Sequence, residues 1–179
     1  FFYSVRTATA QALYFAAKYG GAKDDPARVV SLCDRAYRLY PRNYYFCATA
    51  GEAAYRAALD PKRDDRVALS AAAERWCAAG LRVNPYKTEL RLLRARLLAR
   101  ESIREAIDYW EAYVDWHFWS PFNHAVRVDL YAQAGDVDKA VEALAWVKGS
   151  DYFDAANRTL QDAWAKERAS QAGPPGQSP

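Results

Sequence analysis

The segment YAQAGDVDKAVEAL, residues 131–144, carries the clearest structural signal in the chain. Gly135 separates two stretches that are otherwise rich in helix-forming residues, and glycine commonly ends a helix. The segment therefore predicts two helices joined by a turn, with Tyr131 closing the first and Ala140 as a small contact residue in the second. Reading outward, Gly and Pro breaks of the same kind predict nine helices, at residues 4–19, 26–40, 43–59, 65–83, 86–100, 102–119, 123–134, 136–148 and 151–169.

Two of the predicted helix ends repeat one pattern. Cys33-x2-Ala36-x4-Pro41 and Cys77-x2-Gly80-x4-Pro85 place matching residue types 44 positions apart. The small residue lets two helices approach closely, and the proline stops the helix. Helix pairs that are too small to bury their own apolar faces stack on one another. The pattern therefore predicts stacked helical hairpins with these cysteines in the core. The three cysteines show no C-x-x-C spacing and no disulfide framework.

The repeated pattern resembles the tetratricopeptide repeat (TPR), whose consensus runs W-x2-L-G-x2-Y, then A-x3-F, then P. The matching stretches are Tyr131-x3-Gly135-Asp136-x3-Ala140-x3-Leu144 and Cys47-x2-Ala50-Gly51-x2-Ala54. The resemblance implies an all-α fold of antiparallel helix hairpins stacked as a right-handed superhelix (an α-solenoid), with about four helix pairs and a C-terminal capping helix. We expect this TPR-like domain to cover residues 1–169 and a flexible Pro/Gly/Ser tail to cover residues 170–179.

The composition excludes several classes of protein. The chain has 179 residues, of which 51% are hydrophobic and 26% charged, so it has enough apolar surface to form a core and is not disordered throughout. No run of apolar residues is long enough to span a membrane. The net charge of +3 is below that expected of a nucleic-acid-binding domain. Arg96, Arg100 and Arg104 share one helical face, but interleaved glutamates favour a solvated, salt-bridged face over an anion-binding stripe.

No pattern of catalytic residues is evident. The two histidines, His117 and His124, flank Pro121 without an H-E-x-x-H motif or a nearby cysteine, which argues against a metal site. The sequence contains neither a phosphate-binding loop nor a G-x-S-x-G motif. We therefore expect no catalysis and no cofactor in these residues.

The resemblance also nominates partner-binding residues, because TPR proteins commonly bind peptides in a concave groove lined by the first helix of each pair. By position, these are Ala48, Glu52 and Tyr55, then Arg91, Ala95 and Leu98, then Ala125, Asp129 and Ala132. The Lys/Asn/Arg clamp for a peptide C-terminus is not evident, since Glu52 stands where an asparagine would be needed. A receptor for chaperone tails is therefore disfavoured.

An aromatic block at residues 109–122 is the other candidate surface. It contains Tyr109, Trp110, Tyr113, Trp116, Phe118, Trp119 and Phe122. On a helix, Tyr109, Trp110, Tyr113 and Trp116 would share one broad face. Either neighbouring helices bury the whole block, or Trp116, Trp119 and Phe122 remain exposed to bind a partner or a second copy.

These observations predict a non-catalytic scaffold that binds a protein or peptide partner, with a homodimer through the aromatic block as one form of that interaction. The alternative is a C-terminal soluble TPR-like domain of a larger bacterial membrane protein, such as an O-antigen ligase or polymerase. The lack of methionine and the Phe1-Phe2-Tyr3 start suit such a fragment.

Overall fold

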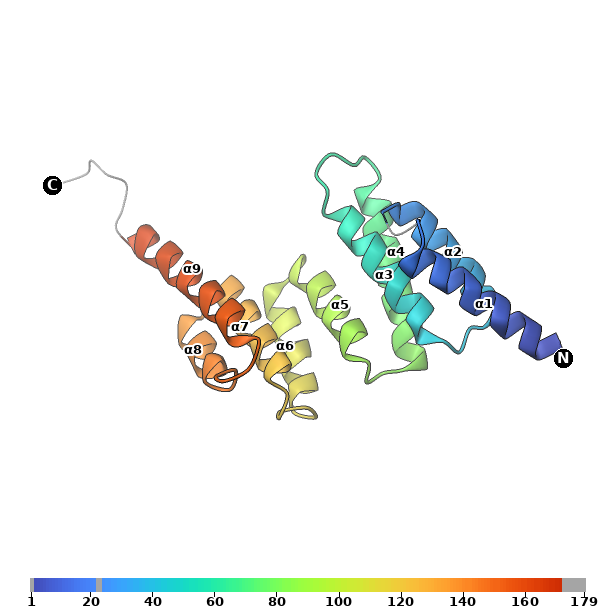
Figure 1. The fold of residues 1–179 in the computed structure, drawn as a ribbon. Coiled ribbons are helices and arrows are strands. Elements are labelled where there is room, and N and C mark those ends of the chain that lie inside the picture. The colour runs from blue at the N-terminus through green and yellow to red at the C-terminus, as the bar shows by residue number, and fades with distance from the viewer. Residues whose placement is uncertain (1, 22–23, 172–179) are drawn as a thin grey trace. The chain divides into compact units, whose positions relative to one another are not determined.

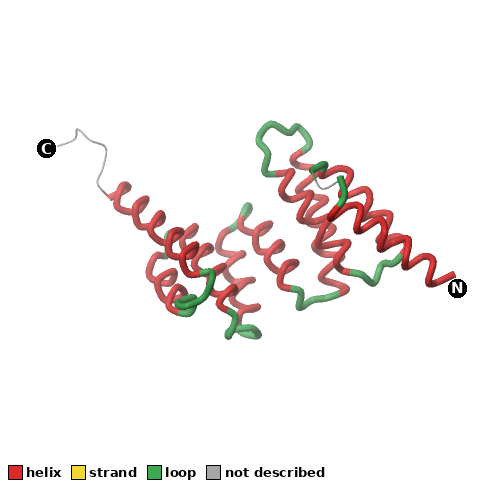
Figure 2. Tube along the Cα trace, viewed as in Figure 1, coloured by secondary structure: helices red, strands yellow, loops and turns green. Residues whose placement is uncertain are grey.

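The computed structural model describes residues 2–21 and 24–171 of the chain, and every regular element in those ranges is a helix (Figures 1 and 2). The helices are α1 (Phe2–Tyr19), α2 (Pro26–Leu39), α3 (Tyr44–Ala58), α4 (Arg66–Val83), α5 (Thr88–Ala99), α6 (Ile103–Val114), α7 (Pro121–Ala134), α8 (Val137–Ala145) and α9 (Phe153–Gln171). The predicted tail at residues 170–179 falls outside the described residues from 172 onward. The chain divides into two compact units, Phe1–Leu97 (unit 1) and Leu98–Pro179 (unit 2), and each is described by itself.

Side-chain caps and one left-handed glycine set the helix ends. Asp25, Asn43 and Ser102 each precede a helix and accept a hydrogen bond from a backbone N–H of its first turn, at 3.0–3.3 Å. Such caps satisfy N–H groups that have no partner within the helix. Gly135 ends α7 with φ +74°, a conformation that side chains with a Cβ rarely adopt. The turn predicted at Gly135 is therefore confirmed.

The sixth helix is shorter than predicted. The sequence indicated a helix over residues 102–119, but α6 ends at Val114 and residues 115–120 form a turn. Asn123 and His124, at the start of α7, bond the carbonyl oxygens of His117 and Phe118. These carbonyls are held by residues later in the chain, so helix propensity along 102–119 does not decide where α6 ends.

Unit 1 is built from two helix pairs and most of α5. α1 packs on α2, α2 on α3, and α3 on α4. The small residues of the repeated pattern lie where helices meet. A Cβ added at Gly80 would lie 2.7 Å from Leu90 Cδ1, and one at Gly51 would lie 2.8 Å from Leu93 Cδ2. The close packing predicted at Gly80 is confirmed, with the Leu90 side chain of α5 and Cys47 of α3 as its neighbours.

Unit 2 places α7 in the middle of a small helical core. α7 contacts α6, α8 and α9, and α9 also packs on α8, as expected of a capping helix. The buried residues between these helices are Val128, Tyr131, Ala140, Ala143, Val147, Ala156 and Leu160. Tyr131 and Ala140, the two positions singled out in the sequence, are both part of this core.

The three cysteines are buried and unpaired. Burial raises the pKa of the Cys33 thiol to about 12 and the pKa values of Cys47 and Cys77 to about 11. The Cys77 thiol lies 3.3 Å from the carbonyl oxygen of Leu90, to which it donates. All three thiols are therefore protonated at neutral pH and serve as small core residues.

Candidate functional site

Unit 1 contains an open groove of about 590 Å³. Most of its lining comes from α1, α3 and residues 87–96 in and just before α5, and α2 adds Pro26 and Val29. The lining residues are Tyr14, Ala17, Lys18, Pro26, Val29, Tyr45, Ala48, Thr49, Glu52, Ala53, Arg56, Lys87, Glu89, Leu92, Leu93 and Arg96. Small and aliphatic side chains alternate here with charged ones, which suits contact with both the side chains and the backbone of a bound segment.

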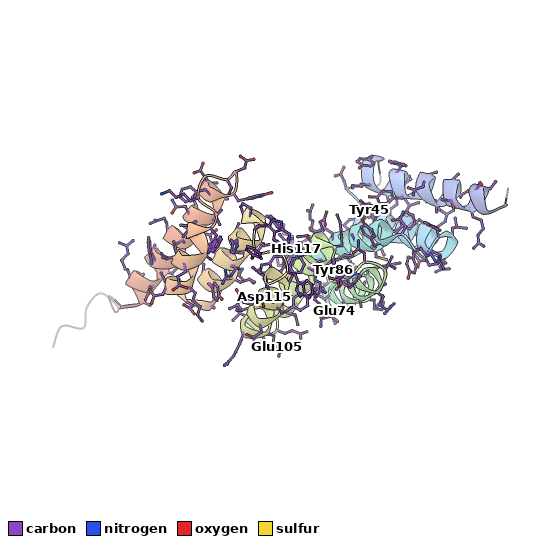
Figure 3. All side chains as sticks on the ribbon, turned by 90° about the horizontal axis from the view of Figure 1, so that it is seen from below. Tyr45, Glu74, Tyr86, Glu105, Asp115 and His117 are labelled. Atoms are coloured by element: carbon purple, nitrogen blue, oxygen red, sulfur yellow. The ribbon has the colours of Figure 1, made fainter. Side chains whose placement is uncertain are left out.

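Tyrosines and lysines gather at one end of the groove. The ring centroids of Tyr14 and Tyr45 lie 6.5 Å apart, and Figure 3 labels Tyr45 at the start of α3. The Lys18 ammonium lies 5.6 Å from the Tyr14 ring centroid, and the Lys87 ammonium lies 5.6 Å from that of Tyr45. Lys87 also pairs with Glu89 at 2.9 Å. Contacts with Tyr14 raise the pKa of Lys18, and Glu89 raises that of Lys87, so both remain cationic.

Two arginines share one carboxylate further along α3. Arg56 Nε lies 2.7 Å from Glu52 Oε1, one helical turn away on the same helix. Arg96 Nη1, from α5, lies 3.8 Å from the same oxygen. The second contact is too long for a hydrogen bond. Glu52 therefore holds Arg56 firmly and Arg96 only loosely.

The aromatic block of unit 2 divides into a buried part and an exposed part. Trp110 and Tyr113, on α6, are buried. Trp116, Phe118 and Trp119, in the turn that follows, are 68%, 55% and 65% exposed. We call these three residues the aromatic turn.

Buried polar groups fix the aromatic turn in place. Trp110 Nε1–H donates to the carbonyl oxygen of Asn123 at 3.0 Å, and Asn123 Nδ2 donates to that of His117 at 3.1 Å. His124 is buried and bonds the carbonyl oxygen of Phe118 through Nε2. The exposed rings therefore project from a turn whose backbone is held at two consecutive carbonyls.

The tautomer of His124 follows from its neighbours. Arg127 Nη1 lies 3.2 Å from His124 Nδ1, and because a guanidinium only donates, Nδ1 must accept and Nε2 carries the proton. Arg127 Nε also donates to Glu111 at 2.7 Å, and the Tyr131 hydroxyl donates to the same carboxylate at 2.9 Å. Burial lowers the pKa of His124, and the positive charge of Arg127 lowers it further.

Comparison with known proteins identifies the fold. No protein-family model and no curated protein matches the chain. Among solved structures, the chain is similar to the crystal structure of a thermophilic TPR protein from Thermus thermophilus. The TM-score is 0.72 at 17% sequence identity, over 87% of this chain and 81% of that one. The chain has a TPR-like fold.

The TPR-like fold explains why α1, α3 and α5 line the groove together, since they are the first helices of successive pairs. Of the groove residues nominated from the sequence, Ala48 and Glu52 lie in it. Tyr55 instead packs against the core of unit 1, and Arg91 donates from Nε to the carbonyl oxygen of Pro85 at 2.7 Å. Leu98 is half-buried in unit 2.

The sequence reasoning missed the part of α5 that faces the groove. The lining residues there are Glu89, Leu92, Leu93 and Arg96, which recur at helical spacing. The nominated positions differ from these by one or two residues. The spacing i, i+3, i+4, i+7 of these four residues is the sequence signal that could have found them.

None of the nominated residues of unit 2 is among the residues that line the unit 1 groove. Asp129 is exposed on α7, and Ala125 packs against the core of unit 2. Phe122 is half-buried, with its ring centroid 5.4 Å from that of Tyr152. Within the part of the chain that the structure describes, no three His, Cys, Asp or Glu residues are grouped for a metal, and no helix is long and apolar enough to cross a membrane.

Proposed function

We propose that the chain is a non-catalytic interaction scaffold whose unit 1 groove binds an extended segment of a protein or peptide partner. The observation that supports this most directly is the lining of the groove, because three successive first helices contribute side chains to one open surface. Its lining includes Ala17, Ala48, Ala53 and Leu92, whose small or aliphatic side chains leave room for the backbone of a ligand to approach. The TPR-like neighbour supports the fold on which this proposal depends.

The length of the groove sets the length of the segment. Tyr45 and Arg56 lie at opposite ends of the lining along α3. A helix rises 1.5 Å per residue, so they are about 16 Å apart along the axis. An extended peptide covers that distance with about five residues. The groove therefore fits a short linear segment.

Selection from a random peptide library on the immobilised full chain tests this proposal. Enriched peptides are then measured against the wild type and Ala48→Trp, which places an indole in the groove. We expect Ala48→Trp to weaken binding at least tenfold. Ala78→Trp, on an exposed position of α4 outside the groove, is the matched control and should bind as the wild type does. If no peptide is enriched, or if Ala48→Trp binds every enriched peptide normally, the groove proposal is wrong.

A second candidate interaction surface is the aromatic turn of unit 2, and its exposure favours this role. Three aromatic side chains of which more than half is exposed present roughly 300 Å² of apolar surface. A standard interface buries about 800 Å² per partner, so the turn could form its apolar centre. We propose that a second copy of the chain binds here. Light scattering should give a dimer for the wild type and a folded monomer for Trp116→Ala/Trp119→Ala. A monomeric wild type would contradict this.

The larger membrane protein considered from the sequence stays a prediction. Its test is the gene context, where apolar spans encoded upstream in the same reading frame would support it and further helical repeats would support a scaffold.

A further inference from the structure

The unit 1 groove has more positive than negative side chains. Its lining contains four cations, Lys18, Arg56, Lys87 and Arg96, and two carboxylates, Glu52 and Glu89. The excess is shared between the two ends. The tyrosine end has Lys18 and Lys87 with Glu89, and the other end has both arginines with Glu52. Each end therefore carries one uncompensated positive charge.

The uncompensated groups can be named. Among the described residues, the groups that act on the Lys18 ammonium are Tyr14 and Tyr19, whose rings it lies over, and no carboxylate is among them. Arg96 is 3.8 Å from a Glu52 oxygen that Arg56 already holds at 2.7 Å. Both cations line the groove and are exposed, so a ligand carboxylate can reach either of them.

We propose that the segment bound in this groove is acidic, with one carboxylate for each cationic end of the groove and apolar side chains between them. This inference rests on the proposed function of the groove. The two cations lie at different levels of the groove, because the Lys18 ammonium is over the ring of Tyr14, beside Tyr45, and Arg96 is next to Glu52, about 10 Å further along α3. Lys18 binds one carboxylate and Arg96 the other. The apolar residues between them lie on Ala48, Ala53 and Leu92.

Glu52 limits the affinity of this site. Its carboxylate occupies the place between Arg56 and Arg96 where a ligand carboxylate would lie. A ligand must displace it or tolerate its repulsion. Replacing Glu52 with glutamine keeps the shape of the side chain and removes the negative charge. Binding of an acidic segment should then become tighter, whereas removal of a residue that contacts the ligand would weaken binding.

Fluorescence polarisation with three labelled peptides tests the proposal on the full chain. The probes are Gly-Asp-Leu-Ala-Val-Ala-Asp-Gly and its counterparts with Asn or Lys at both Asp positions. We expect the acidic peptide to bind about fivefold or more tighter than the Asn peptide and the Lys peptide to bind most weakly. Lys18→Gln and Arg96→Gln should each weaken the acidic peptide about two- to fivefold and leave the Asn peptide unchanged, as is typical for partly exposed charge pairs.

Matched variants separate a specific site from general charge attraction. Glu52→Gln should strengthen acidic binding severalfold, whereas Arg35→Gln and Arg75→Gln, exposed on α2 and α4 outside the groove, should leave it unchanged. If those two controls weaken binding as much as Lys18→Gln does, the site assignment is wrong.

Three further outcomes would overturn the proposal. Equal affinity for acidic and neutral peptides, lost in Ala48→Trp, would keep the groove as a peptide site and refute its charge preference. Library-selected peptides that bind in the groove and carry no acidic residues would have the same meaning, and failure of both the probes and the library would also remove the proposed function. Tighter binding of a single-stranded oligonucleotide, lost in Lys18→Gln and Arg96→Gln, would assign the charge to phosphate.

Discussion

Replacing Gly80 with alanine should destabilise the protein, although alanine is the better helix former. In the interior of a helix, Gly→Ala alone would stabilise by about 1 kcal/mol. At Gly80 the new Cβ would lie 2.7 and 2.8 Å from the two Cδ atoms of Leu90 and 3.0 Å from Cys47 Cβ. Leu90 and Cys47 are fully buried, so neither has open space to move into. Overpacking of this kind costs about 1–3 kcal/mol. The packing cost therefore outweighs the propensity gain, and we expect a net loss of about 1 kcal/mol.

Urea unfolding followed by circular dichroism measures this change. Ala78→Gly, at an exposed position of the same helix, calibrates the propensity term and should cost about 1 kcal/mol. Leu90→Val removes one buried methylene and should partly relieve the overlap, so the double variant should be more stable than the sum of the single changes predicts. A Gly80→Ala protein that is stabilised by about 1 kcal/mol would refute the close packing of Leu90 and Cys47 against Gly80.

Three other predictions concern buried groups. The pKa of His124 is lowered in the folded chain, so the unfolded chain binds a proton more readily. Stability should therefore decrease as the pH falls below about 6.5. In thermal melts, the stability of His124→Gln should depend less on pH in this range. The raised thiol pKa values predict that Cys33, Cys47 and Cys77 react with iodoacetamide at pH 8 only in urea; rapid labelling of the native chain, read by mass spectrometry, would contradict this. Trp110→Phe removes the donor to the carbonyl of Asn123, and a buried unpaired group costs about 1–3 kcal/mol in urea unfolding, whereas Trp146→Phe, at an exposed position, should change stability little.

Local sequence signals predict most of the fold because the residues that begin and end its helices act on neighbouring residues in the chain. Asn43 begins α3 through its own side chain, and Gly135 ends α7 because its backbone adopts a left-handed conformation. In the repeated pattern, a small residue follows Cys33 and Cys77 by about one helical turn. The second of these small residues, Gly80, lies where helices meet. These features act within a few residues, so a single sequence contains them.

The groove was harder to predict because α5 offers no unique apolar face. Leu90 and Leu97 are buried, Leu92 lies in the groove, and Leu93 is both buried and part of the groove lining, so leucines occur around much of the helix. Periodicity then does not distinguish the core side from the ligand side. The distinction comes from Gly51 and Gly80, whose missing side chains make room for Leu93 and Leu90.

The aromatic block shows how contacts from the next helix decide which aromatic side chains are exposed. If the helix had continued to residue 119, Trp116 would have shared a face with the buried Tyr113. The helix ends at Val114 instead, and Asn123 and His124 hold the carbonyls of the turn that follows. The rings of Trp116 and Trp119 therefore face solvent while Trp110 stays in the core. Whether these aromatics are core or surface depends on where α6 ends, and two polar residues of the next helix hold the turn at that point.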